Sequence, residues 1–210
     1  MNRVGLIDYG MGNLHSVAKA LEHAGASVHA IKKPDDLQHC DRVVLPGVGA
    51  FRDCADALQN NGMDEAIKTY TSKGNPFLGI CLGMQVLMDL SLEFGEYRGL
   101  GLIVGTVKPL PEGLPALGCK IPHMGWNDVT FANALPIHPV LSPLHGQQVY
   151  YVHAYYCAPT HASHILAACS YGDFPFASAM GYDNIIGVQF HPEKSQRAGL
   201  AMLKCFVNWK

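Results

Sequence analysis

The stretch "PFLGICLGMQ", residues 76–85, decides the fold. An apolar run from Pro76 to Cys81 leads into a Gly-x-Cys-x-Gly pattern, and a helical pattern follows. Short apolar runs are typical of buried strands, and glycines allow the chain to turn sharply. The stretch therefore predicts a strand that turns directly into a helix, with Cys81 at the corner between them.

Strand and helix patterns alternate on the N-terminal side of this junction. The predicted strands are "RVGLID" (3–8), "SVHAI" (27–31) and "RVVLP" (42–46), and the predicted helices lie near 13–25, 50–59 and 63–73. Asn13 is a suitable N-cap for the first helix. Such alternation is typical of a parallel sheet with helices on both faces.

The pattern changes after Glu96. Apolar and aromatic runs at 100–110, 147–156, 164–171, 174–182 and 184–190 are separated by Gly, Pro, Asn or Asp, which predicts mostly antiparallel strands. We expect surface loops at 107–118 and 121–127, and a last helix from Ser195 to Trp209. The predicted fold is one α/β domain over residues 1–210, with a mostly parallel central sheet flanked by helices and antiparallel strands added by the C-terminal half.

Composition narrows the classes of partner. The 210 residues are 49% hydrophobic and 15% charged, with a formal net charge of -2 and no basic run, so no nucleic-acid surface is predicted. No apolar segment reaches the roughly 20 residues of a membrane span, and the N-terminus does not resemble a signal peptide. Seven cysteines without a C-x-x-C pair indicate reduced thiols. We expect a cytoplasmic protein that uses no metal or cofactor and binds small molecules and proteins.

Cys81 has two readings. A Gly-x-nucleophile-x-Gly corner exposes a nucleophile at the start of a helix, whose free N–H groups favour a thiolate and an oxyanion. The alternative is a buried thiol in a glycine-rich turn, and the five-residue pattern alone divides the two about evenly.

The segment "GVQFHPEKS" (187–195) offers a partner for such a thiol. His191 follows an apolar run, so it should lie at the end of a strand, where open α/β folds place their sites. Glu193 could accept the other imidazole N–H and fix the tautomer. A lone His-Pro-Glu is, for an arbitrary sequence, more often a solvated turn.

Two further patterns are a glycine-rich turn, expected at the same edge of the sheet, and a pair of histidines that could suggest a metal site. "PGVGAF" (46–51) is a glycine-rich turn after the third predicted strand, and its N–H groups could face developing negative charge. It has no following G-K-[ST], so it is not a phosphate loop. His161 and His164 have no third ligand nearby, which makes a metal site improbable.

These segments together resemble the class I (triad) glutamine amidotransferases. "PGVGAF", "GICLGMQ" and "GVQFHPEKS" occur in the family's order, and "PGVG" with "PHMGWN" (122–127) narrows the resemblance to the glutaminase subunits of imidazole glycerol phosphate synthase in histidine biosynthesis. The resemblance runs nearly end to end, from "IDYGMGNLHSV" (7–17) through "YYVHAYY" (150–156).

The resemblance implies a role for each matching residue. Cys81 is the nucleophile that attacks L-glutamine, and His191 with Glu193 completes the triad. The backbone amides of Val48 and Leu82 form the oxyanion hole. The residues matching the glutamine pocket are Gly47, Gly49, Gln85, His153 and Tyr155.

The resemblance also implies a protein partner. In this family the ammonia passes to a (βα)8-barrel cyclase subunit, which forms imidazole glycerol phosphate and an aminoimidazole carboxamide ribotide. Met124, Trp126, Tyr150 and Lys194 match positions at or near that interface. One departure concerns the pocket, because Ala154 stands where the family usually has Ser or Thr.

Three alternatives stay open at this stage. A paralogous pair could supply ammonia for surface-sugar amidation, a silent homologue could act as a regulatory module, and the chain could be a standalone cysteine hydrolase. Only the identity of the partner and its substrate distinguishes the surface-sugar paralogue from the histidine-pathway subunit. The complete set Cys81, His191 and Glu193 argues against a silent regulatory module.

Overall fold

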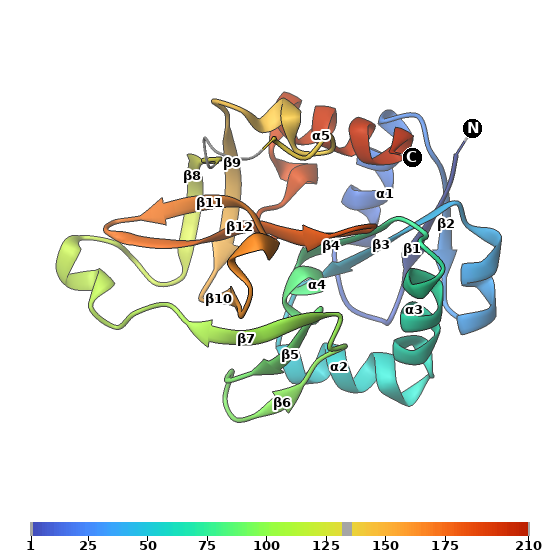
Figure 1. The fold of residues 1–210 in the computed structure, drawn as a ribbon, viewed down its shortest axis with the longest axis horizontal. Helices are drawn as coiled ribbons and strands as arrows, with labels where there is room; N and C mark the ends of the chain where they lie inside the picture. The colour runs from blue at the N-terminus through green and yellow to red at the C-terminus, as the bar shows by residue number, and fades with distance from the viewer. Residues whose placement is uncertain (1, 132–135, 210) are drawn as a thin grey trace.

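A seven-stranded sheet forms the centre of the molecule (Figure 1). The computed structural model describes residues 2–131 and 136–209. In spatial order the strands are β11 (Ile165–Tyr171), β12 (Phe174–Tyr182), β13 (Ile185–Val188), β4 (Phe77–Cys81), β3 (Arg42–Gly47), β1 (Arg3–Ile7) and β2 (Ser27–Ile31). Strands β13, β4, β3, β1 and β2 are parallel, whereas β12 and β11 run antiparallel to their neighbours. The predicted sheet type is confirmed.

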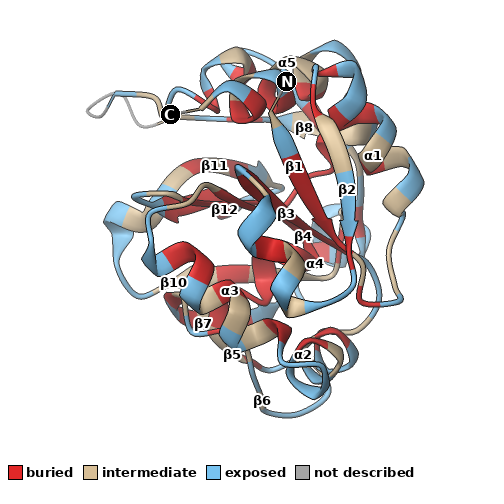
Figure 2. Cartoon of the chain, turned by 90° about the vertical axis from the view of Figure 1, so that its right-hand side faces the viewer, coloured by how far each residue is buried: buried red, intermediate tan, exposed pale blue. Residues whose placement is uncertain are grey.

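Two pairs of helices cover the two faces of this sheet. Helices α1 (Leu14–His23) and α5 (Gln196–Asn208) pack on one face, and α2 (Phe51–Asn60) and α3 (Met63–Ser72) on the other (Figure 1). Val44 on β3 contributes to the core under α1 and α5, while Val43 and Leu45 contribute to the opposite core, as the alternation of a strand requires. Figure 2 shows the central strands buried between these layers.

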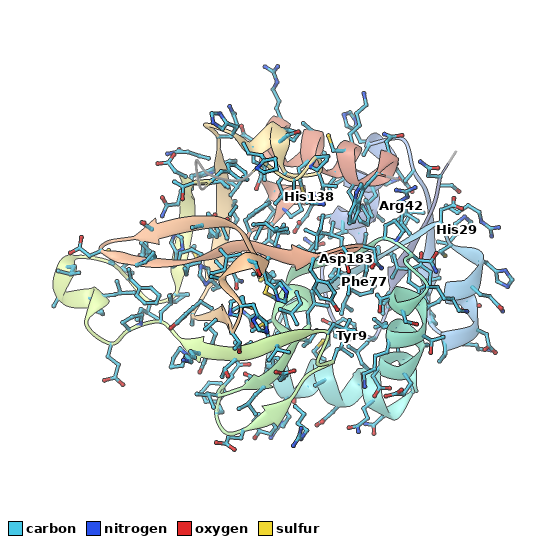
Figure 3. The ribbon with its side chains drawn as sticks, viewed as in Figure 1. Tyr9, His29, Arg42, Phe77, His138 and Asp183 are labelled. Atoms are coloured by element: carbon cyan, nitrogen blue, oxygen red, sulfur yellow. The ribbon has the colours of Figure 1, made fainter. Side chains whose placement is uncertain are left out.

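Arg42 ties the last helix to the sheet. The side chain, labelled in Figure 3, is 7% exposed, and its Nη1 donates to the carbonyl oxygens of Phe206 (2.8 Å) and Trp209 (2.7 Å). A buried guanidinium needs such acceptors because burial of an unpaired charge is costly. The C-terminal end of α5 is thereby fixed against β3.

The second half of the chain adds two smaller sheets. One has the order β10 (Tyr155–Pro159), β7 (Ile103–Pro109), β5 (Met88–Ser91) and β6 (Tyr97–Arg98), and the other pairs β8 (His123–Asp128) with β9 (Gln148–His153). Short 3-10 segments lie at Pro34–His39, Leu114–Leu117, Ser142–Leu144, Ala162–His164 and Pro192–Lys194. Most of the pairings are antiparallel, as predicted, with β5 and β7 the parallel exception.

Two local predictions were wrong. Residues 121–127 contain strand β8 rather than forming a loop, because residues 123–128 pair in register with β9. The run 147–156 divides into two strands that belong to different sheets, with Ala154 between them. The predicted strand-to-helix junction at Cys81 is confirmed, because β4 is followed directly by α4 (Leu82–Gln85). This helix is a single turn, since the carbonyls of Val86 and Leu87 accept from the amides of Leu100 and Leu102.

Two further findings concern membrane-spanning helices and the cysteines. Within the ranges that the structure describes, no helix has both the length and the apolar character needed to cross a membrane. All seven cysteines are free thiols.

Candidate active site

Cys81 sits at the junction of β4 and α4 in a backbone conformation that non-glycine residues rarely adopt. Its φ is 55° and its ψ is -111°. Such positive φ values at residues other than glycine cost about 1–3 kcal/mol and occur most often at functional sites. Cys81 is 7% exposed, and its Sγ lies 3.9 Å from the carbonyl oxygen of Val152. The geometry is that of a nucleophile corner.

The two glycines that flank the cysteine are required by close packing. A Cβ on Gly83 would overlap the carbonyl oxygen of Leu45 on β3, and a Cβ on Gly79 would overlap the carbonyl of Gly83. Neither position can accept even alanine without movement of the backbone. The glycines therefore let α4 start directly against β3 and β4, which fixes where the thiol lies.

His191 and Glu193 form a buried pair beside this corner. His191 lies three residues beyond the end of β13, and its Nδ1 is 2.8 Å from Oε1 of Glu193. Both side chains are almost fully buried, at 4% and 1% exposed. Within the described part of the chain, His191 Nε2 has no hydrogen-bond partner. The carboxylate thus holds Nδ1 and leaves Nε2 available to a reacting group.

The surroundings of His191 favour its charged form. Burial alone lowers the pKa of the imidazole, but Cys81 and Glu193 together outweigh that effect and raise the pKa to about 9. A thiolate and a carboxylate on either side of an imidazolium act in the same direction. His191 is therefore the group of this site that is suited to hold a proton at neutral pH.

Ser195 anchors the His191 segment to strand β9. Its hydroxyl donates to the carbonyl oxygen of His191 at 2.6 Å and accepts from the backbone amide of Tyr150 at 3.0 Å. The His191 amide in turn donates to the Tyr150 carbonyl at 2.9 Å. These three bonds fix the position of the histidine relative to the second half of the chain.

A cavity of about 470 Å³ opens above Cys81. Its walls are Val48, Gly49, Cys81, Leu82, Gln85, Glu93, Phe94, Pro122, Val152, His153, Ala154, Tyr155 and His191. The cavity thus brings together nearly all of the catalytic, oxyanion and substrate residues that the sequence predicted. Gly47 and Glu193 do not line it. Its volume lies in the range of small-molecule sites.

The candidate oxyanion donors come from two loops. Leu82 begins α4, so its backbone N–H belongs to the helix-start amides that lack an intrahelical partner. Val48 is 41% exposed on the loop between β3 and α2. Tyr9, labelled in Figure 3, is buried, and within the described residues its hydroxyl has no hydrogen-bond partner. Burial raises the pKa of Tyr9 far above its ordinary value, Cys54 adds to the rise and the Val48 backbone opposes it.

His153 lines the same cavity as a neutral group. Its Nδ1 donates to the carbonyl oxygen of Tyr155 at 2.9 Å, and its Nε2 is 3.0 Å from Nδ1 of His123. Burial lowers the pKa of His153 to about 3 and that of His123 to about 4. Both nitrogens of His153 are engaged, so it acts here as a fixed part of the wall.

The four predicted interface residues gather on one surface formed by β8, β9 and the segment after His191, which we name the β8–β9 face. Met124 and Trp126 are 61% and 44% exposed, and the Trp126 and Tyr150 rings pack edge to face at 6.2 Å. The Lys194 Nζ lies 5.8 Å from the centre of the Tyr150 ring. A basic group next to exposed apolar and aromatic side chains is typical of a protein-binding surface.

Three residues of the site were not predicted from the sequence. Glu93 lines the cavity and accepts from the Phe51 amide at the start of α2, Gln189 lies against Cys81, and Ser195 holds His191. Gln189 stands two residues before His191 in "GVQFHPEKS", so the motif contained it. Glu93 had no comparable signal. In the part of the chain that the structure describes, no group of three or more His, Cys, Asp or Glu side chains is placed to hold a metal ion.

Comparisons with known proteins agree with this geometry. Residues 5–209 match the family model described as glutamine amidotransferase class-I. The chain is 47% identical to the imidazole glycerol phosphate synthase subunit HisH of Methylococcus capsulatus, over 100% of this chain and 98% of the relative. It is 45% identical to the subunit of the same name from Geobacter sulfurreducens, over 100% of both chains.

Solved structures show the same fold at lower identity. A crystal structure titled as a glutamine amidotransferase superposes with a TM-score of 0.72 at 16% identity, over 97% of this chain and 98% of that one. PurLQS from Thermotoga maritima gives a TM-score of 0.75 at 18% identity, over 100% of this chain and 99% of that chain. At these identities the likeness concerns the fold alone.

Proposed function

This chain belongs to the class I glutamine amidotransferase family, and on that premise we propose that it is the glutaminase subunit of an imidazole glycerol phosphate synthase. It hydrolyses L-glutamine to glutamate and ammonia, and the ammonia is used by a cyclase subunit in histidine biosynthesis. The observation that carries the proposal is the arrangement at the cavity floor, where Cys81 in a strained corner adjoins the buried pair of His191 and Glu193.

The first chemical step forms a covalent intermediate. The Cys81 thiolate attacks the side-chain carbonyl carbon of glutamine, and a tetrahedral oxyanion results. The Leu82 amide is the first candidate donor to that oxygen. As the C–N bond breaks, the His191 imidazolium gives its Nε2 proton to the departing nitrogen, which leaves as ammonia. A glutamyl thioester remains on Cys81, and His191 is neutral.

The second step releases glutamate. Neutral His191 takes a proton from water, and the resulting hydroxide adds to the thioester carbonyl. Collapse of this second tetrahedral species breaks the C–S bond, so glutamate leaves, the thiolate re-forms and His191 is again the imidazolium. Glu193 holds Nδ1 in both steps and stabilises the charged imidazole.

The cavity walls suggest how the substrate is held. Glu93 presents a carboxylate to the cavity and suits the α-ammonium group of the amino acid. Tyr155 and Gln85 also line the wall, where the Tyr155 carbonyl accepts a hydrogen bond from the Gln85 amide. Ala154 offers only a methyl group there, so a side-chain hydroxyl contact is missing at that position.

The second oxyanion donor is the Val48 amide, after a change in its loop. Val48 lies half-exposed on this loop at the rim of the cavity, and we assign the loop a resting state in which its amide does not face the oxyanion. A loop in this state leaves the oxyanion hole incomplete. We therefore expect low glutaminase activity of the chain alone and strong activation when the partner and its ligand are bound.

The β8–β9 face is the proposed docking surface for the (βα)8-barrel cyclase. Trp126→Ala removes its largest exposed ring, so we expect weaker binding of the partner and an unchanged free energy of unfolding, within about 0.5 kcal/mol. Calorimetric titration with the cyclase and urea unfolding measure the two quantities. Unaltered affinity would contradict this placement.

The direct test of the function is glutamate release by the purified chain, alone and with the cyclase and its ribotide ligand. Acid quenching during turnover, followed by mass spectrometry of the Cys81 peptide, should reveal the glutamyl adduct. Cys81→Ala is the control and should abolish both signals. Absence of glutamate in every mixture would favour the non-catalytic regulatory module, and full activity without a partner would favour a standalone hydrolase.

The expected cytoplasmic location is a further part of this proposal. Seven free thiols are consistent with the reducing conditions of that compartment.

A further inference from the structure

Gln189 lies against the sulfur of Cys81. The side chain is fully buried, and its Nε2 is 3.8 Å from Cys81 Sγ. Its Oε1 is 3.2 Å from Nε2 of Gln85, and that same nitrogen is 3.2 Å from the carbonyl oxygen of Tyr155. A continuous chain of polar contacts therefore runs from a backbone carbonyl on β10, through two amides, to the sulfur.

The direction of every bond in this chain follows from its first member. A backbone carbonyl can only accept, so Gln85 must present its NH2 group to Tyr155. The second hydrogen of that NH2 is then available to Gln189, which must present its oxygen to Gln85. The NH2 group of Gln189 consequently faces Cys81. The sulfur receives a hydrogen bond from Gln189 and cannot be the donor.

The first member is itself held in place. The Tyr155 carbonyl also accepts from His153 Nδ1 at 2.9 Å, and the other nitrogen of His153 is engaged by His123. When Cys81 is a neutral thiol, its own proton has a separate acceptor, the Val152 carbonyl, 3.9 Å from Sγ. The contact with Gln189 is thus oriented for the ionised sulfur.

We propose that Gln189 is a further catalytic residue, which donates a hydrogen bond to the Cys81 thiolate and, with His191, keeps the sulfur ionised and aimed into the cavity. The inference rests on the proposed role of Cys81 as nucleophile. A buried donor strengthens as an acceptor gains charge, because a charge-assisted hydrogen bond is roughly twice as strong as a neutral one. The thioester sulfur carries no charge, so the contact favours the thiolate before attack and as the leaving group afterwards.

The competing explanation is that Gln85 and Gln189 only satisfy each other in the core. In that case removal of the Gln189 donor would lower stability without changing the chemistry of the sulfur. The alkylation rate of Cys81, measured separately from the other cysteines, distinguishes the catalytic role from the structural one, because this rate follows the fraction of Cys81 present as thiolate.

The test is the pH dependence of Cys81 alkylation by iodoacetamide, read from the Cys81 peptide by mass spectrometry, with Cys205 in the same sample as internal reference. Gln189→Met keeps the size but removes the donor. A hydrogen bond to a charged group corresponds to about one pH unit at the lower end of its range, so the midpoint should rise by about one unit. At pH values well below the wild-type midpoint, the alkylation rate should fall about tenfold. Ser178→Ala, which removes a buried hydroxyl bonded to Tyr151, is the matched control and should leave the midpoint unchanged.

If Gln189→Met does not fold, a second variant provides the same test. Gln189→Glu keeps the shape and the acceptor for Gln85 but places a carboxylate against the sulfur, so the midpoint should rise further. In the wild-type protein, the side-chain amide resonance of Gln189 should shift as Cys81 titrates and stay fixed in Cys81→Ala.

The outcomes separate this inference from the function itself. An unchanged midpoint in folded Gln189→Met or Gln189→Glu, or an amide resonance insensitive to Cys81, overturns the role of Gln189 and leaves Cys81 as nucleophile. Glutamate release that persists in Cys81→Ala overturns the function instead.

Discussion

Two buried histidines line one cavity and carry opposite properties. His191 follows β13, and its pKa is raised to about 9 because Cys81 and Glu193 outweigh its burial. His153 ends β9, and burial lowers its pKa to about 3, a shift that the Tyr155 carbonyl opposes without reversing it. Both residues are nearly inaccessible, at 3% and 5% exposed. Burial therefore does not decide which histidine can be charged, and the bonding partners do.

The partners also decide which nitrogen is free. His191 engages Nδ1 with a carboxylate and keeps Nε2 without a partner in the described chain. His153 donates from Nδ1 to a carbonyl and accepts at Nε2 from His123. A group that moves protons needs one free nitrogen and a pKa that permits both forms. Only His191 meets both conditions, and His153 serves as a fixed support for the Tyr155 carbonyl.

The largest expected effect comes from replacing each histidine by asparagine. His191→Asn removes the proton donor and acceptor and should lower kcat for glutamate release by about 10³-fold or more. His153→Asn should keep kcat within about tenfold and raise KM, since it disturbs only the wall. Steady-state kinetics of both variants in the presence of the partner give the comparison. Loss of kcat in His153→Asn with retention in His191→Asn would reverse the assignment.

The next effect concerns the carboxylate that distinguishes the two histidines. Glu193→Gln removes a negative charge beside His191, so the pKa of the imidazole should fall from about 9 toward its ordinary value. Loss of the imidazolium at rising pH then begins earlier, and the alkaline limb of the kcat profile moves to lower pH. At neutral pH we expect about 10²-fold lower kcat. An alkaline limb at the wild-type position would contradict the role given to Glu193.

A smaller effect is expected at the support of His153. His123→Phe retains the ring that stacks on Tyr171 but leaves Nε2 of His153 without its donor. An unpaired buried acceptor costs about 1–3 kcal/mol, so urea unfolding should show that loss. KM for glutamine should rise a few-fold while the pH profile of kcat stays unchanged.

Identical unfolding curves and KM for wild type and His123→Phe would mean that His153 does not need this bond. A moved kcat profile would mean instead that the His123–His153 pair takes part in proton transfer.

The sequence predicts the role of His191 better than the role of His153. His191 was predicted because strand, His, Pro and Glu follow one another, so local order places the carboxylate at Nδ1. His153 was predicted only as a pocket residue through the family resemblance. Its neutral state depends on His123, which is 30 residues away and belongs to a strand that was not foreseen.

Strand β8 was not predicted because its inward-facing side chains are polar. His123 is buried by stacking on Tyr151 and Tyr171, and Asn127 donates to the Ser170 carbonyl, so no apolar alternation marks the strand. The parallel half of the sheet was predicted well for the opposite reason, since β3 and β4 are buried along their whole length and contain few polar residues. Gln189 and Glu93 were missed because their contacts join segments about 108 and 42 residues apart.

A further effect is a gradual dependence of stability on pH. Below pH 6.5 an unfolded histidine binds a proton that folded His123 and His153 do not, so the unfolded state gains protons and stability falls as the pH drops toward 4. Each histidine contributes about 1.4 kcal/mol per pH unit in this window. His191 has the opposite sign, because the folded form keeps its proton up to about pH 9 and stability falls as the pH rises from 6.5.

Urea unfolding at intervals between pH 4.5 and 9 measures both limbs. His123→Phe should flatten the acid limb, and His191→Asn should flatten the alkaline one. Equal slopes in wild type and both variants would show that these groups do not control the pH dependence.

The most direct test of the central claim is a titration of the two imidazoles themselves by NMR, with ¹⁵N-labelled histidine and with His191→Asn and His153→Asn for assignment. We expect His191 to remain the imidazolium through neutral pH and to titrate near pH 9, while His153 stays neutral with its proton on Nδ1 down to below pH 5. A neutral His191 at pH 7 beside a charged His153 would contradict that claim.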